Sequence, residues 1–282
     1  MEFRERRYTC QDGLSLYFRD YGDAASPLAP VVCLPGLTRN SKDFGALARR
    51  LSVSRRVLCP DYRGRGRSQY DTEWRRYHPR SYIDDVRHLM VVNNVHRAVF
   101  VGTSMGGIVA AGLAVAAPTL VAGVILNDVG PVIETDGIGK IVDYVRDTRV
   151  QPGWDAAVRH LKETFPDRPA TSDSEWLAIA QATYRETDDG TLRVDWDPDL
   201  VKPLRAAGAI EIDLWPIFGA LRHIPTVAIR GALSDVLSAE TLTGLQSFLP
   251  SMAAITIDGV GHAPSLAEPE ALLASDELLA RV

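Results

Sequence analysis

The chemistry of this chain centres on a serine held between two glycines. Ser104 stands between Gly102 and Gly106 in the pattern G-x-S-x-G. A short apolar run, residues 98–101, leads into it, and small residues suited to a helix, residues 105–117, follow. A serine at such a sharp strand-to-helix turn presents its hydroxyl clear of both elements, and the glycines leave room for the strained backbone. The pattern therefore predicts a nucleophilic serine.

A nucleophilic serine needs a base, and the best placed histidine is His262. It lies in a Gly-rich loop after the apolar run at residues 253–257, from which it can reach over the end of a sheet. The imidazole in turn needs a carboxylate to hold its tautomer. We favour Asp235, in the loop after residues 226–229, because Ser…Asp…His is the usual chain order of such residues. Asp128, at the end of the preceding core strand, is the alternative.

Acyl transfer also requires two backbone donors for the oxyanion. The N–H of Met105 comes directly after the nucleophile at the start of a helix, where N–H groups and the helix dipole favour negative charge. We expect the second donor to be the N–H of Leu37, in the loop after the apolar run at residues 31–34. Gly36 lets this loop pass close to Ser104.

Short apolar strands alternate with helices along most of the chain. An antiparallel hairpin is expected over residues 9–21, with its turn at Asp12-Gly13. Continuous apolar runs between helical stretches are typical of parallel strands buried on both faces. The pattern predicts an α/β fold with a doubly wound, mostly parallel sheet. The strands are expected at residues 31–34, 56–59, 98–101, 121–126, 226–229 and 253–257, and the helices at 41–51, 81–93, 105–117, 238–249 and 267–281.

From Pro131 onward this alternation stops. Helical spacing recurs there without a clear strand between, and we expect helices at residues 137–150, 154–165, 172–185 and 203–212 and an extended piece at 191–196. We therefore expect a core of residues 1–130 and 215–282 with a helical cap, or lid, at residues 131–214. The aromatic residues expected to line an apolar substrate pocket are Trp154, Trp176, Tyr184 and Trp215.

A second Gly-rich loop, residues 61–68, carries several arginines. It has neither the G-x-x-x-x-G-K-[ST] nor the G-x-G-x-x-G pattern of phosphate-binding loops. We expect a structural loop fixed by a polar contact between Asp61 and Arg63, with an anion site as the alternative.

Together these motifs closely resemble those of the α/β-hydrolase family over nearly the whole chain. The resemblance implies an eight-stranded, mostly parallel sheet with a helical cap after the sixth strand, and Ser104, Asp235 and His262 as catalytic triad. Many members carry His-Gly where this chain has Pro35-Gly36, so a side-chain hydrogen bond of the oxyanion loop is lost here. Ser104 argues against relatives with an aspartate nucleophile, such as haloalkane dehalogenases and epoxide hydrolases. The matching stretches are Pro35-Gly36-Leu37, residues 61–68, Gly102 to Gly107, Asp235 and Gly261-His262.

Composition narrows the partners. The 282 residues carry a net charge of −5 with no basic stripe, which argues against nucleic acid. The sequence has no apolar run of membrane-spanning length and no signal peptide, so we expect no membrane partner. Three cysteines without C-x-x-C spacing suggest a reducing cytoplasm. The histidines are scattered, and we expect neither a metal nor a cofactor.

The sequence thus predicts a serine hydrolase that cleaves a small carboxylic ester, lactone or thioester through an acyl-enzyme. A C–C bond hydrolase of the meta-cleavage type is an alternative within the resemblance, and so is halide-dependent perhydrolase chemistry as a side activity. A ligand receptor with very slow turnover on the same fold is an alternative from another class. The acyl group, the leaving group and the oligomeric state stay open.

Overall fold

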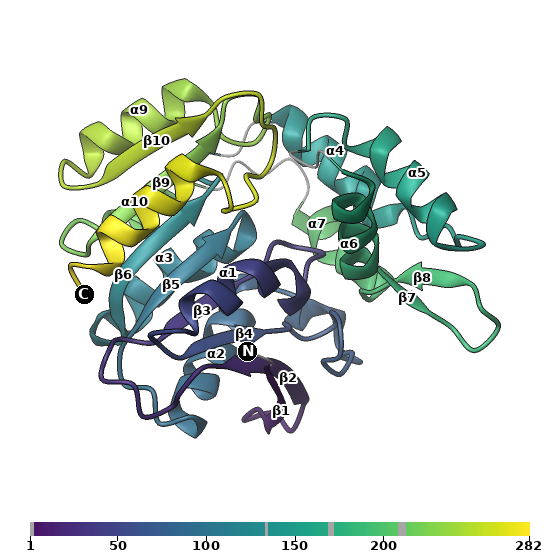
Figure 1. Cartoon of the computed structure of the whole chain (residues 1–282), viewed down its shortest axis with the longest axis horizontal. Coiled ribbons are helices and arrows are strands. Elements are labelled where there is room, and N and C mark those ends of the chain that lie inside the picture. The colour runs from purple at the N-terminus through teal and green to yellow at the C-terminus, as the bar shows by residue number, and fades with distance from the viewer. Residues whose placement is uncertain (1–2, 133–134, 169–171, 208–212) are drawn as a thin grey trace.

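The fold is built on one large sheet. The computed structural model describes residues 3–132, 135–168, 172–207 and 213–282. Eight strands follow the order β1-β2-β4-β3-β5-β6-β9-β10 (Figure 1). β1 pairs with β2 and β2 with β4 antiparallel, and the remaining pairs are parallel. The mostly parallel sheet is therefore confirmed. Its strands are β1 (Arg4–Thr9), β2 (Ser15–Tyr21), β3 (Val31–Leu34), β4 (Val57–Pro60), β5 (Ala98–Thr103), β6 (Val121–Asn127), β9 (Thr226–Gly231) and β10 (Ala253–Ile257).

Helices cover both faces of this sheet. Alternate residues of each strand point to opposite faces, and in β3 Val31 and Cys33 join one apolar cluster while Val32 and Leu34 join the other. Because all four side chains are buried, the run reads as continuously apolar in the sequence. The first cluster packs α1 (Gly45–Leu51) and α10 (Pro269–Leu279), and the second packs α2 (Pro79–Val92), α3 (Met105–Ala116), α8 (Trp215–Gly219) and α9 (Ala239–Phe248).

Helix starts differ from expectation by a few residues. α2 begins at Pro79, two residues earlier than expected, because proline fits the first turn and the His78 side chain accepts a hydrogen bond from the Arg80 N–H. The helix expected from residue 41 begins instead with a 3-10 turn, Ser41–Phe44, capped by the side chain of Asn40.

An insertion of mainly helical structure follows β6, as expected. It contains α4 (Thr135–Arg146), α5 (Trp154–Thr164), α6 (Asp173–Thr183), α7 (Val201–Ala207) and a hairpin of β7 (Tyr184–Glu186) and β8 (Leu192–Val194). We call this insertion the cap; it stands to one side of the sheet (Figure 1). The hairpin was only partly expected, because its first strand fell within an expected helix. The expected helix at residues 203–212 is observed as far as Ala207, and its remainder lies outside the described residues.

The cap contacts the loops that leave the carboxyl ends of the strands. The Gly66 N–H, after β4, donates to the Asp195 carbonyl at 2.8 Å. The Gly261 N–H, after β10, donates to the Asp167 carbonyl at 2.9 Å. Functional groups of parallel sheets gather at this edge, so the cap lies where a substrate would bind.

The loop at residues 61–68 is structural, but its ion pairs are not those expected. Arg63 pairs with Asp85, Asp71 and Asp12 at 2.6–2.8 Å, and its side chain is buried. Asp61 instead accepts the backbone N–H groups of Ser41 and Arg67. The expected contact between Asp61 and Arg63 is therefore wrong, because each finds other partners in the fold.

Arg63→Met should destabilise the protein strongly. Removing one partner of a buried ion network leaves uncompensated carboxylates, at a cost of about 3–5 kcal/mol in the free energy of unfolding. Urea unfolding would measure it. The matched control is Arg75→Met, whose exposed pair with Glu73 should contribute little to stability. Equal effects of the two substitutions would contradict this prediction.

Candidate active site

Ser104 occupies a strained turn between β5 and α3. Its φ is +52°, a left-handed conformation that costs energy for a residue with a side chain. Its N–H donates to the Asn127 carbonyl at 2.9 Å, which extends the β5–β6 pairing to the turn itself. The side chain is partly exposed and takes no helix-capping hydrogen bond. The hydroxyl is therefore available to react and is not taken up in capping the helix.

The two flanking glycines are required by close backbone approach. A Cβ at Gly106 would lie 2.0 Å from the Leu34 carbonyl oxygen, and a Cβ at Gly102 would lie 2.5 Å from the backbone of Gly106. No side chain fits at such distances. β3, β5 and α3 can therefore meet tightly beneath Ser104, as the G-x-S-x-G pattern predicts.

His262 is hydrogen-bonded to Asp128. The distance from His262 Nδ1 to Asp128 Oδ2 is 2.6 Å, and Asp128 is fully buried. The same carboxylate accepts the Gly231 N–H at 2.8 Å and the Ser234 hydroxyl at 2.5 Å. Because the carboxylate of Asp128 accepts the hydrogen bond from the ring, a proton lies on His262 Nδ1, and Nε2 is the ring nitrogen left to act as a base.

Asp235, the favoured acid, is elsewhere. Its carboxylate forms an ion pair with Lys140 of α4 at 2.5 Å, and more than a third of its side chain is exposed. The structure pairs the histidine with the alternative, Asp128, so the expectation for Asp235 is corrected. The physical reason is loop geometry: the loop after β9 turns Ser234, not Asp235, towards the buried carboxylate.

Three contacts hold the loop that carries His262. Asn127 Nδ2 donates to the Pro264 carbonyl at 2.9 Å, and the Leu233 N–H donates to the Val260 carbonyl at 2.9 Å. The third is the Gly261 N–H to the cap. Sequence reasoning missed Asn127 and Ser234; the position of Asn127 at a strand end, directly before Asp128, was the available signal.

The expected oxyanion donors flank the serine. Met105 is the first residue of α3, so its N–H has no partner within the helix. The N–H of Leu37 likewise donates no hydrogen bond to any residue that the structure describes. The Leu37 carbonyl accepts from Nε of the fully buried Arg65 at 2.7 Å, which fixes the orientation of this peptide. A Cβ at Gly36 would lie 3.8 Å from Ser104 Cβ, so the two loops are in close approach.

The four aromatic residues expected to line a pocket lie in two places. Trp176 and Tyr184 are buried in the apolar interior, and Trp154 is partly buried against it. Trp215 packs edge-on against Phe248 of α9, with ring centres 5.2 Å apart. These are packing contacts of cap and core.

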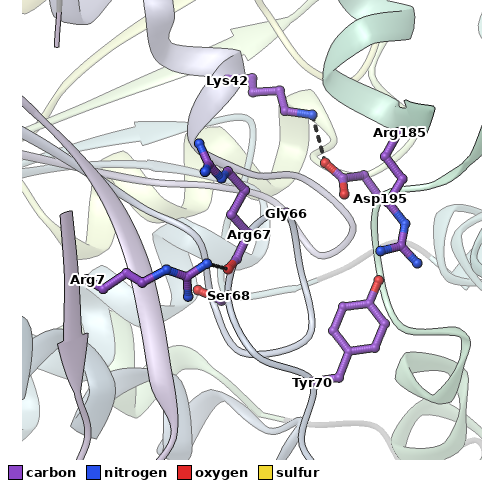
Figure 2. Close-up of a pocket in the computed structure, with 8 residues that line it drawn as sticks. All are labelled: Arg7, Lys42, Gly66, Arg67, Ser68, Tyr70, Arg185 and Asp195. Atoms are coloured by element: carbon purple, nitrogen blue, oxygen red, sulfur yellow. Dashed lines mark hydrogen bonds and ion pairs between the residues drawn. The ribbon is translucent and has the colours of Figure 1, made fainter. Parts of the chain in front are cut away.

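A basic pocket of about 580 Å³ lies beside the loop at residues 61–68 (Figure 2). Among the residues that line it, Lys42 pairs with Asp195 at 2.7 Å and Arg67 pairs with Glu5. The lining contains neither Ser104 nor His262 as the structure describes it. The pocket is therefore separate from the serine and histidine described above. The pocket is lined by Arg7, Lys42, Gly66, Arg67, Ser68, Tyr70, Arg185 and Asp195.

Within the described residues, no cluster of three or more His, Cys, Asp or Glu side chains could hold a metal ion. No helix in this part of the chain is both long and apolar enough to cross a membrane.

Comparison with known protein families identifies the fold. A profile described as "Alpha/beta hydrolase family" matches residues 31–275. The chain belongs to the α/β-hydrolase family. This match spans Ser104, Asp128 and His262 together, and the family membership inferred from the motifs is confirmed.

The chain is similar to hydrolases of several bacteria. The crystal structure of an α/β hydrolase from Novosphingobium aromaticivorans is 40% identical, covers 100% of this chain and 99% of its own, and superposes with a TM-score of 0.93. The 3-hydroxybutyrate-oligomer hydrolase of Cupriavidus necator is 31% identical over 89% of this chain and 88% of its own. The 2-(acetamidomethylene)succinate hydrolase of Mesorhizobium japonicum is 26% identical over 84% and 83%.

Proposed function

We propose that this α/β hydrolase is a serine hydrolase that cleaves a small carboxylic ester through an acyl-enzyme. Ser104 is the nucleophile, His262 the base and Asp128 the acid. The observation that carries the proposal is the 2.6 Å hydrogen bond between Asp128 and His262 Nδ1, next to a strained serine turn. The proposal therefore keeps the nucleophile and base expected from the sequence and exchanges the acid.

In acylation, Ser104 Oγ attacks the ester carbonyl while His262 Nε2 takes its proton. The carbonyl oxygen becomes an oxyanion, and the backbone N–H groups of Leu37 and Met105 donate to it. The C–O bond to the alcohol then breaks, and His262 returns the proton to the leaving oxygen. Asp128 stabilises the imidazolium formed between these steps and does not itself take the proton.

In deacylation, water replaces the alcohol. His262 Nε2 takes a proton from the water as its oxygen attacks the acyl carbonyl, and the second oxyanion meets the same two donors. As the bond to Ser104 Oγ breaks, His262 returns the proton to that oxygen, which restores the serine hydroxyl and releases the carboxylic acid.

Of two named relatives, one supports an ester as the substrate class, and the other acts by name on a compound with an acetamido group and no ester. One is a hydrolase of 3-hydroxybutyrate oligomers by name, and hydroxy acids form oligomers through ester bonds. The other is by name a hydrolase of a substituted succinate. Both names denote hydrolysis of small molecules that carry carboxyl groups.

Covalent labelling tests the proposal. A fluorophosphonate probe should add to the protein once, and peptide mapping should find the adduct on Ser104. An ester series of increasing acyl length, read as kcat/KM, should then show turnover because that ratio reports transition-state binding. Labelling of another residue, or the absence of labelling and turnover, would overturn the proposal.

The same assays separate the alternatives. Turnover of a vinylogous diketone in preference to every ester would favour a C–C bond hydrolase. Tight ligand binding with negligible turnover of any ester would favour a receptor. Bromination dependent on peroxide would reveal the perhydrolase side activity.

A further inference from the structure

The side chain of Arg39, a residue of the core, lies close to Ser104 at its base. A Cβ at Gly36 would lie 3.4 Å from Arg39 Cγ and 3.8 Å from Ser104 Cβ, so both side chains lie close to this glycine. The Arg39 guanidinium binds both oxygens of Asp43, at 2.7 and 2.6 Å, and donates to Thr183 of the cap at 2.6 Å. Its charge is thus balanced by one carboxylate.

An arginine of the cap begins beside the base. Arg168 directly follows Asp167, whose carbonyl accepts the Gly261 N–H one residue before His262. Among the described residues its guanidinium has no hydrogen bond and no ion pair, and its contact there is with the ring of Phe165 at 6.0 Å. Burial, followed by the nearby charge of Arg39, lowers the pKa of Arg168 to about 10. The guanidinium therefore stays charged at neutral pH without a counter-ion of its own.

A buried hydroxyl lies close to both arginines. Tyr144 of α4 is held by edge-on packing against Phe165, at 4.8 Å between ring centres. Its hydroxyl is buried and donates no hydrogen bond to any described residue, while the Arg39 guanidinium lies near its oxygen. Burial raises the pKa of Tyr144, and the nearby positive charges of Arg39 and Arg168 lower it by a smaller amount. The tyrosine stays protonated and leaves one buried donor unused, which is costly unless a ligand accepts from it.

The surroundings of Arg168 thus hold one positive charge in excess. Arg39 and Asp43 cancel, Arg168 remains, and Tyr144 adds an unsatisfied O–H. A carboxylate supplies what is missing, because it brings one negative charge and two planar oxygens that match the guanidinium fork and can accept from a hydroxyl. Its charge would also relieve the repulsion between the two arginines.

We propose that Arg168 and Tyr144, with Arg39 beside them, bind a carboxylate of the substrate between cap and core. The preferred substrates are then esters that carry a free carboxylate in addition to the ester bond. This inference rests on the proposed function and adds the substrate class to it.

A matched substrate pair tests the carboxylate. The linear ester dimer of 3-hydroxybutyrate ends in a carboxylate, and the same dimer with a terminal carboxamide has its shape without the charge. We expect the wild-type enzyme to prefer the acid by about 10- to 100-fold in kcat/KM, the value of a charge-assisted hydrogen bond. Arg168→Gln should reduce this ratio to near one, and Arg168→Lys should keep part of it because the charge remains.

The control removes the same charge from another part of the cap. Arg193 of β8 is exposed, so Arg193→Gln should leave the acid-to-amide ratio unchanged. A wild-type ratio near one, or a ratio unaffected by Arg168→Gln, overturns the inference while the esterase proposal stands. If neither dimer is cleaved, calorimetry with Ser104→Ala protein decides. Tighter binding of the acid than of the amide supports the carboxylate site, and equal or absent binding overturns it.

Discussion

Ser104→Ala is expected to lower kcat for ester hydrolysis by about 10⁶-fold, the loss typical of removing the nucleophile of a serine triad. The change deletes a single oxygen. Alanine still has to adopt the φ of +52° that the turn imposes, so the fold and Tm should stay close to wild type. The residual rate reports what the two oxyanion donors and substrate binding achieve without covalent catalysis. Stopped-time assays at high enzyme concentration would measure it.

Ser247→Ala is the matched control, because Ser247 is an exposed serine of α9. It should keep wild-type kcat and wild-type labelling by the fluorophosphonate probe. If Ser104→Ala retained more than a hundredth of the wild-type kcat, another group would have to be the nucleophile.

Asp128→Asn should lower kcat by about 10⁴-fold, because an amide can no longer fix the proton on His262 Nδ1 or stabilise the imidazolium. The substitution keeps the size of the side chain, so the change in kcat should exceed any change in KM. Steady-state kinetics on one neutral ester would measure both constants.

Asp235→Asn is the decisive comparison. Its carboxylate forms a partly exposed ion pair with Lys140, so removing the charge should change kcat by no more than about twofold. The reverse ranking, with Asp235→Asn the more damaging substitution, would restore Asp235 as the acid and contradict the assignment of Asp128.

Most of the architecture could be read from the sequence because the strands are buried on both faces. The runs at Val31–Leu34 and Ala253–Ile257 agree with the observed strands residue by residue. The apolar continuity of Val31–Leu34 follows from helices on both sides of the sheet, whereas Ala253–Ile257 forms an edge strand in which only Ile257 is buried. Helix starts were less certain, because caps such as His78 and Asn40 depend on side-chain contacts that no periodicity reports.

The acid could not be chosen from the sequence. Asp128 and Asp235 both fall between Ser104 and His262, so the chain order Ser…Asp…His does not separate them. Strand order does: β6, which ends directly before Asp128, pairs with β5, which ends directly before Ser104. That neighbourhood is a property of the assembled sheet, as is the turn that points Ser234 inward.

The sequence predicts where the cap begins and ends in the chain, but not which of its residues face the core. The spacing of α5 predicted the helix correctly, yet nothing in it placed the following Asp167 and Arg168 beside the histidine loop. Arg39 and Arg168 are far apart in the chain and meet through the fold. The apolar pocket expected from four aromatic residues stays a prediction, whereas the proximity of Arg39 and Arg168 could be seen only in the structure.

The hydrogen bond from the Gly261 N–H to the Asp167 carbonyl joins the cap to the residue directly before His262. Lifting the cap would break this bond and release the backbone just ahead of His262. A displacement of the cap at Asp167 would therefore also disturb the position of the His262 imidazole.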